Sequence, residues 1–236
     1  MTNDRMYIGQ ELTIFAHAIN WKKYYTAIIK PYFGKRVLEV GAGMGATTAI
    51  MCDGTQVEWV CLEPDPDLRN EIARLISDKK LPACCHTQGG FVADLERGNS
   101  FDTFIYIDVL EHIEDDYAEL QAASVRLAPG GHLIVLSPAF HFLYSPFDRS
   151  IGHYRRYNKK MLQTLSPKDC EIEKMMYLDS VGMATSLINR FFLSQSMPTV
   201  AQIRFWDKWI IPLSKWADRL FAYRFGRSLL GIWKRT

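Results

Sequence analysis

The stretch RVLEVGAGMGATT, residues 36–48, decides the fold: a short apolar strand runs into three glycines and then into small, helix-compatible residues. Glycine adopts left-handed backbone conformations and lets the chain approach a ligand closely. We therefore expect this turn to hold a nucleotide-like ligand. Its spacing fits two patterns, because Gly41–Ala46 reads as the dinucleotide turn G-x-G-x-x-A, while Glu39 begins an acid-x-G-x-G-x-G pattern.

Strand-like and helix-like segments alternate on both sides of this turn and predict an α/β fold with a doubly wound, mostly parallel, seven-stranded sheet. We expect strands at residues 36–41, 57–63, 83–87, 101–110, 132–138, 171–179 and 226–236. We expect helices at residues 10–29, 45–52, 66–79, 114–128 and 159–166, with a turn at 129–131. Ligands of such sheets bind beyond the carboxyl ends of the strands, which is where the glycine turn, Glu63 and Asp108 would meet.

Length and composition limit the class of protein. The chain has 236 residues, of which 48% are hydrophobic and 23% charged, enough for one full-sized core. Its five cysteines show no C-x-x-C spacing, so we expect buried thiols in a reducing compartment, with no disulfide and no metal site. We find no signal-peptide pattern and no apolar run of about eighteen residues, and we expect a cytoplasmic protein.

Glu63 and Glu39 bear on the choice of ligand. Glu63, at the end of the second strand, fits an acid that binds the ribose hydroxyls of a dinucleotide or of S-adenosylmethionine. Glu39 separates the two ligands, because its charge would repel a diphosphate but attract the ammonium group of a methionine tail. The carboxylate before the turn therefore favours the sulfonium cofactor.

Five motifs in order extend this interpretation: VLEVGAGMG (37–45), VCLEPD (60–65), QGGFVADL (88–95), YIDVLEHIED (106–115) and LAPGGHLIVLSPA (127–139). On these motifs, over about residues 35–138, the chain resembles the class I S-adenosylmethionine-dependent methyltransferases. Relatives that methylate adenine or glutamine carry an Asn-Pro-Pro-Tyr-like loop at the end of the fourth strand. This chain has DVLEH there instead, which is similar to the small-molecule branch of the family. The resemblance implies the Rossmann-like methyltransferase fold and S-adenosyl-L-methionine as the cofactor.

The resemblance also implies roles for single residues. Those expected to contact the methionine part of the cofactor are Glu39, Gly41, Ala42, Gly43, Gly45, Asp108, Val109 and Leu110. Glu63 would accept from the ribose hydroxyls, Pro64 would border the adenosine, and Gly90 and Phe91 would flank the adenine. Each has a structural alternative: Glu39 could cap the following loop, and Phe91 could belong to the core.

The acceptor side is expected in the loop after the strand that ends near Ser137. A neutral histidine can take a hydroxyl proton near neutral pH, so His153 is the leading candidate base and His141 the second. The residues expected to bind the acceptor are Tyr25, His112, Arg155, Arg156 and Tyr157. The alternative is that GHYRRYNKK approaches a helix, with its aromatic residues packed inward and its cations solvated.

The carboxyl-terminal region is basic, since residues 199–236 carry eight Lys or Arg against two Asp, whereas the remainder has a net charge of −4. Residues 181–222 are expected to form apolar helix interrupted at Pro198 and Pro212. The apolar stripe expected there is Ile203, Trp206, Ile210, Leu213, Ala217 and Leu220. It is compatible with peripheral membrane contact, but we favour packing on the sheet or roofing of a pocket.

The predicted organisation is one methyltransferase domain over residues 1–236. It comprises an N-terminal helical segment (1–34), a cofactor-binding core (35–180), a helical cap insertion (181–225) and a final strand (226–236). The predicted activity is methyl transfer to a small, partly apolar acceptor that can carry an anionic group, with oxygen favoured. A nicotinamide-dependent oxidoreductase and a noncatalytic S-adenosylmethionine-binding protein are the alternatives. Nucleic acid is disfavoured, because the sequence pI is about 8.2 and no basic run is broad. The sequence does not fix the oligomeric state.

Overall fold

The computed structural model describes residues 8–96, 100–192 and 197–236 and shows a seven-stranded sheet in the order β3-β2-β1-β4-β5-β7-β6. The strands are β1 (Arg36–Val40), β2 (Glu58–Leu62), β3 (Cys85–Gln88), β4 (Phe101–Ile107), β5 (Leu127–Pro138), β6 (Cys170–Leu178) and β7 (Ser228–Arg235). Strand β7 runs antiparallel to both of its neighbours, and the other pairs are parallel. The predicted seven-stranded, mostly parallel sheet is confirmed.

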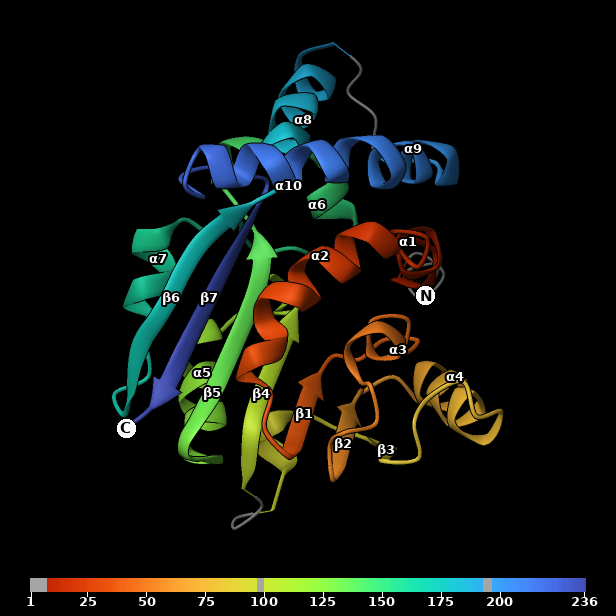
Figure 1. Ribbon diagram of the computed structural model, residues 1–236, viewed down its shortest axis with the longest axis vertical. Coiled ribbons are helices and arrows are strands. Elements are labelled where there is room, and N and C mark those ends of the chain that lie inside the picture. Colours follow the sequence, from red (N-terminus) through yellow and green to blue (C-terminus); the bar gives the residue numbers. More distant parts are fainter. Residues whose placement is uncertain (1–7, 97–99, 193–196) are drawn as a thin grey trace, which may run out of the picture.

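Helices cover both faces of this sheet (Figure 1). They are α1 (Ile8–Phe15), α2 (Ile19–Ile29), α3 (Thr48–Met51), α4 (Pro66–Ser77), α5 (Asp116–Val125), α6 (Pro146–Ser150), α7 (Lys159–Thr164), α8 (Ser180–Phe192), α9 (Val200–Phe205) and α10 (Ile211–Leu220). Strand β1 shows why two layers form, because Val37 faces one buried cluster and Leu38 faces the other. The first cluster includes Trp21 and Trp59, and the second includes residues from α5 and α7.

The amino-terminal helix predicted over residues 10–29 is wrong in one respect, because the structure has two helices there with a break between Phe15 and Ile19. The second helix begins where Asp207, far along the chain, accepts hydrogen bonds from the backbone N–H groups of Asn20 and Trp21 at 3.0 and 2.8 Å. A side-chain acceptor at this place satisfies donors that have no partner within a helix, so it fixes a new helix start.

The boundaries of the central strands also differ from the prediction. Strand β4 ends at Ile107 rather than at residue 110, because the chain turns at Asp108 with a positive φ of 54°. Strand β5 begins at Leu127, so the expected turn at 129–131 is part of the strand, with a register shift against β4 between Phe101 and Thr103. Among the described helices, none is both long and apolar enough to cross a bilayer.

The cap between β6 and β7 contains a helix that continues past Pro212. A π-helical turn (Trp206–Ile210) joins α9 to α10, and Pro212 lies in the first turn of α10, where its missing N–H is tolerated. The expected interruption at Pro212 is therefore wrong. The expected single stripe is also divided, because Ile203, Trp206 and Ala217 are buried whereas Leu213 and Leu220 are exposed.

Buried acids hold this cap to the rest of the fold. Asp218 accepts from the Tyr24 hydroxyl at 2.9 Å and from the backbone N–H groups of Asp179 and Ser180 at 2.8 Å. Asp179 in turn accepts from the Trp206 indole at 3.0 Å. Figure 1 shows the result: α9 and α10 run across the carboxyl ends of the parallel strands, above α2.

Candidate active site

A cavity of about 210 Å³ lies at the carboxyl ends of β1 and β4, beneath the cap. Its walls come from the turn after β1, from α1 and α2, from the segment after β4 and from the loop after β5. Trp206 of the cap and Arg227, just before β7, also reach it. The site therefore lies where an open α/β sheet binds its ligands.

The glycine turn forms one wall through Gly41, Ala42 and Gly43. Gly41 and Gly43 have φ angles of 65° and 57°, in the left-handed region that side chains disfavour. A Cβ atom on Gly41 would lie 2.6 Å from Val109 Cγ2, so only glycine fits against the segment that follows β4. Gly45 is also left-handed, but it faces Leu75 of α4 rather than the cavity.

Glu39 reaches the same wall from within β1. Its Oε2 accepts from Thr48 Oγ1 at 2.7 Å and from the Trp59 indole at 2.9 Å. Burial raises its pKa to about 7, although these two hydrogen bonds oppose the shift. The carboxyl group is thus held in place by one oxygen while it lines the cavity, and a cation there would favour its charged form.

Asp108 faces the glycine turn from the end of β4 and opens into the cavity. Its φ of 54° is unusual for a residue with a side chain, and such conformations concentrate at functional sites. Desolvation by the surrounding protein raises the pKa of Asp108, while the nearby positive charges of Arg227 and Lys22 act in the opposite direction. Asp108 thus has an unfavourable backbone conformation, and its carboxyl group, which faces the cavity, is stabilised in its charged form by nearby positive charge.

The other predicted cofactor contacts lie outside the cavity wall. Glu63 directly follows β2 and accepts from the backbone N–H groups of Gly43 at 2.8 Å and Asp65 at 3.0 Å, so it supports the glycine turn. The positions of Pro64 and Gly90 follow β2 and β3, and Phe91 beside Gly90 is 62% exposed. Val109 and Leu110 pack into the protein and do not line the cavity.

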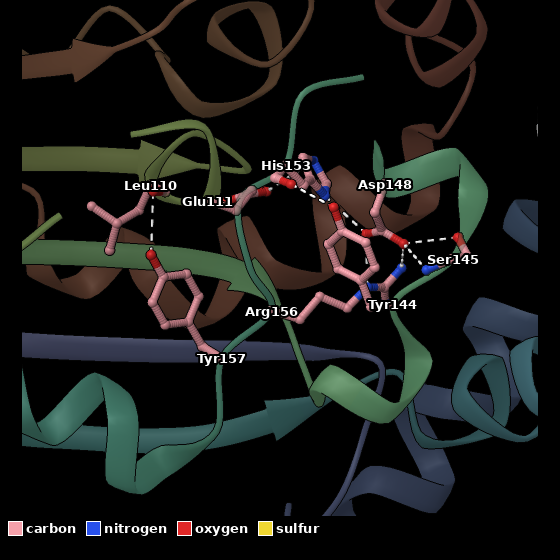
Figure 2. A network of polar contacts seen from close by, with 8 residues as sticks. All are labelled: Leu110, Glu111, Tyr144, Ser145, Asp148, His153, Arg156 and Tyr157. Atoms are coloured by element: carbon pink, nitrogen blue, oxygen red, sulfur yellow. Dashed lines mark hydrogen bonds and ion pairs between the residues drawn. The ribbon is translucent and has the colours of Figure 1, made fainter. Parts of the chain in front are cut away.

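A histidine–aspartate pair from the loop after β5 forms a second wall of the cavity, and Figure 2 shows its contacts. His153 Nδ1 lies 2.9 Å from Asp148 Oδ1, and its Nε2 lies 3.8 Å from Glu111 Oε1. A carboxylate can only accept, so the Nδ1 atom of His153 carries the proton and the Nε2 atom of the neutral ring is left as an acceptor. The pair has the orientation of a general base with its supporting acid.

Asp148 is itself held by several donors. Arg156 binds both of its oxygens, with Nε at 2.7 Å from Oδ1 and Nη2 at 2.9 Å from Oδ2, and Ser145 donates through its backbone N–H and its hydroxyl, each at 2.8 Å. Burial alone would raise the pKa of Asp148, but the hydrogen bonds from His153 and Arg156 outweigh it and hold the pKa below its ordinary value. Asp148 is therefore a fixed anion behind His153.

Glu111 and His112 complete this wall. Glu111 is fully buried, and neither of its carboxyl oxygens has a hydrogen-bond partner in the described part of the chain. Burial, assisted by the charge of Asp108, raises the pKa of Glu111 well above its ordinary value. The His112 ring meets the His153 ring edge to face at 4.5 Å, and desolvation lowers its pKa to about 4.

These side chains also have the composition of a cation site. One ligand atom each from Glu111, His112 and His153 lies within 4.8 Å of the others, which suits a cation held by two histidines and a carboxylate. Asp148 behind His153 is a typical outer partner of such a histidine. The expectation of no metal stays a prediction that chelation can test.

Three of the residues predicted for the acceptor side lie elsewhere. His141 is exposed, stacks on Tyr144 at 5.4 Å and does not line the cavity, so we no longer propose it as a base. Arg155 Nη1 lies 2.5 Å from Asp116 Oδ2, and the Tyr157 hydroxyl donates to the same atom at 2.7 Å. Both are occupied in holding the loop, whereas Tyr25, His112 and Arg156 do reach the cavity.

Five ionisable side chains of the wall were not among the predicted site residues. They are Glu11 of α1, Lys22 of α2, Glu111, Asp148 and Arg227. Burial lowers the pKa of Lys22 to about 8, although the negative charges of Asp108 and Asp207 act to raise it. Lys22 falls on the apolar side of a predicted helix. A charged residue at such a position needs a partner, and this was the feature of the sequence that could have identified Lys22 as a site residue.

Known proteins match this chain over the region that contains the glycine turn and the central strands. Residues 38–133 match a family model described as a methyltransferase domain. A ubiquinone biosynthesis O-methyltransferase of Vibrio cholerae is 31% identical over 124 residues, which are 52% of this chain and 46% of that enzyme. The enzyme of the same name from Xanthomonas axonopodis pv. citri is 34% identical over 125 residues, half of each chain. The chain thus aligns with about half the length of these relatives.

Solved structures match over most of the chain at low sequence identity. Coclaurine N-methyltransferase has a TM-score of 0.62 at 13% identity, covering 92% of this chain and 72% of that one. The cyclase SpnF also has a TM-score of 0.62, at 15% identity, covering 90% of this chain and 80% of that one. At these identities the likeness shows a shared fold.

Proposed function

We propose that this protein is a class I S-adenosylmethionine-dependent methyltransferase that transfers a methyl group from that cofactor to a small acceptor, with oxygen as the favoured target atom. The match of residues 38–133 to a methyltransferase-domain model supports this proposal. The observation that carries the proposal is a single cavity with two different walls. One wall is the glycine turn with two carboxyl groups, and the other is the Asp148–His153 pair.

The first wall fits the cofactor of this family. A left-handed glycine turn that a Cβ atom would obstruct allows close approach of a methionine tail, and Glu39 and Asp108 offer charge to its ammonium group. Glu63 would accept from the ribose hydroxyls, and the exposed ring of Phe91 would cover the adenine. Their places beside the turn, outside the cavity itself, suit a ligand that extends along the sheet edge from β4 towards β3.

The second wall supplies the proton acceptor. The bound cofactor supplies an electrophilic methyl group, so the chain must position an acceptor and take its proton. Nε2 of His153 takes the proton that an acceptor hydroxyl loses, and the positive charge that forms on the ring is stabilised by Asp148 at 2.9 Å. Arg156 keeps Asp148 in place through two hydrogen bonds, and we assign it a positioning role in this proposal.

The walls also favour a class of acceptor. Leu12, Phe15 and Phe147 line the cavity, and the two phenylalanine rings lie 6.2 Å apart. Among the described residues that line the cavity, Lys22 and Arg227 carry positive charge and do not bind Asp148. A partly apolar acceptor with one hydroxyl fits this mixture, and an anionic group on it would pair with Lys22 or Arg227.

Two measurements test the proposal. Calorimetric titration should show binding of S-adenosylhomocysteine and no binding of NADH, and the reverse result would favour an oxidoreductase. Extracts of the host cell incubated with the protein and S-adenosylmethionine should yield a singly methylated product by mass spectrometry. Binding of S-adenosylhomocysteine without any methylated product would favour a noncatalytic binding protein.

A further inference from the structure

The cap helix carries a row of large apolar side chains on its outer side. We call this row the aromatic face: Phe205, Trp209, Leu213, Trp216, Leu220 and Phe221. These side chains are between 44% and 69% exposed. Steps of four, four, three and four residues keep the first five on one side of a helix, so they form a continuous stripe.

This stripe is not needed for packing within the described chain. The opposite side of the same helix buries Ile203, Trp206, Ile211 and Ala217 against the rest of the fold. The helix has therefore covered one apolar side and kept a second one in solvent. Exposed apolar patches of this kind mark sites of interaction.

The charged residues of the cap helix are also divided between its two sides, with the acids on the buried side. The two acids, Asp207 and Asp218, are buried and accept hydrogen bonds from α2 and from the segment after β6. The basic residues of the helix and of the turn after it are Arg204, Lys208, Lys215, Arg219 and Arg224. Within the described residues none of these five forms a salt bridge, and Lys208 Nζ lies 5.1 Å from the centre of the Trp209 ring.

We propose that the aromatic face and these cations dock the protein on the surface of an anionic lipid bilayer, with α10 parallel to the membrane. Tryptophan, phenylalanine and leucine between lysines and arginines are the composition of helices that lie in the interface. Long basic side chains can extend to lipid headgroups while the rings enter the acyl boundary. The proposal does not depend on methyl transfer.

The shape of the surface favours a bilayer over a protein partner. Residues 205–221 form a convex ridge roughly 24 Å long at about 1.5 Å per residue, and protein partners bind such a helix by enclosing it in a groove. A flat anionic surface can engage every residue of a convex stripe at once. The uniformly positive outer charge also disfavours a symmetric contact between two copies, because like charges would face each other.

Cosedimentation of the full chain with vesicles tests the proposal. Binding to phosphatidylglycerol vesicles is expected to exceed binding to phosphatidylcholine vesicles at least tenfold and to weaken with added salt. Each basic residue near an anionic surface contributes about fivefold, so Lys208→Gln with Arg219→Gln should lower affinity for phosphatidylglycerol about 25-fold. Trp209→Ser with Trp216→Ser should lower it at least tenfold.

A control removes exposed apolar side chains elsewhere on the protein. Val57 and Val125 are 72% and 67% exposed and precede β2 and β5 at the other end of the sheet, so Val57→Ser with Val125→Ser should leave vesicle binding unchanged. Near-ultraviolet circular dichroism checks that each variant is folded. The proposal is overturned if the wild-type protein does not bind phosphatidylglycerol vesicles. It is also overturned if the tryptophan variant binds them as tightly as the wild type does. A further result would also overturn the proposal: a wild-type protein that does not bind vesicles but is a dimer by light scattering without lipid. If Trp209→Ser with Trp216→Ser made this dimer monomeric, the aromatic face would be assigned to a second copy of the chain.

Discussion

Replacing His153 with glutamine tests the proposed base. The imidazole Nε2 is the acceptor atom at the cavity, while Nδ1 is bonded to Asp148. Glutamine retains an amide N–H that can donate to Asp148 but has no group that takes a proton near neutral pH. Asp148 also keeps its bonds from Arg156 and Ser145, so the loop after β5 should stay in place.

The expected loss follows from the role assigned to this ring. A positioned general base contributes about 10²- to 10⁴-fold, so kcat should fall by that factor, equivalent to about 2.7–5.4 kcal/mol of transition-state stabilisation. The affinity for S-adenosylhomocysteine should change less than about twofold, because the glycine turn and Glu39, which are assigned to the cofactor, come from another segment of the chain. A kcat effect without a binding effect separates proton transfer from general damage to the cavity.

The assay is steady-state methyl transfer with the acceptor identified from the host extract, together with calorimetry for the cofactor product. His132→Gln is the matched control, because His132, in the middle of β5, pairs with Glu173 of β6 at 3.1 Å and does not line the cavity. A His153→Gln enzyme with kcat within about threefold of wild type, and equal to the His132 control, would refute the base and leave His153 a packing role.

The remaining predictions concern the cofactor wall and the cation site. Glu63→Gln should weaken S-adenosylhomocysteine binding about tenfold, since a hydrogen bond to a charged group contributes about 1.5 kcal/mol, and an unchanged Kd by calorimetry would remove Glu63 from the ribose role. Burial raises the pKa of Glu39 to about 7, so the folded carboxyl group holds a proton between its unfolded pKa, near 4.5, and about 7. An ammonium group beside it favours the charged form, so cofactor binding near pH 7 should release protons, seen as a binding enthalpy that varies with buffer. Glu39→Gln should reduce this variation, and a buffer-independent enthalpy in wild type would argue against the pairing. Methyl transfer should continue after dialysis against a chelator; loss of the rate with recovery on adding a divalent cation would instead assign Glu111, His112 and His153 to a metal.

Local patterns allowed the sheet to be predicted. The strand before Gly41 is short and apolar, and left-handed glycines leave few alternatives to a tight turn at the sheet edge. The approximate end of each parallel strand then places Glu39 and Asp108 near one another without any knowledge of side-chain contacts. These features depend on residues close in sequence, which is why the sequence was sufficient for them.

Features that depend on distant residues were missed. The break between α1 and α2 is fixed by Asp207, which is 187 residues from Asn20, and no sequence window includes both. Arg156 had the chemistry of an anion-binding residue, but Asp148 occupies it with two bonds. The cap helix continues through Pro212, which lies in the first turn of α10 directly after a π-helical turn, and Leu213 and Leu220 lie on its outer side.

The cap connects the two proposed surfaces within a few residues. Trp206 lines the cavity, and Asp207 accepts from the start of α2, the helix that brings Lys22 and Tyr25 to the same wall. Lys208 and Trp209, the next two residues, point outward to the surface proposed to meet lipid. The buried acids therefore fix the outer face relative to the cavity, so a protein docked through Trp209 would hold its cavity at a set distance from the bilayer. Such an arrangement suits an acceptor whose apolar part resides in the membrane, which agrees with the apolar side chains that line the cavity.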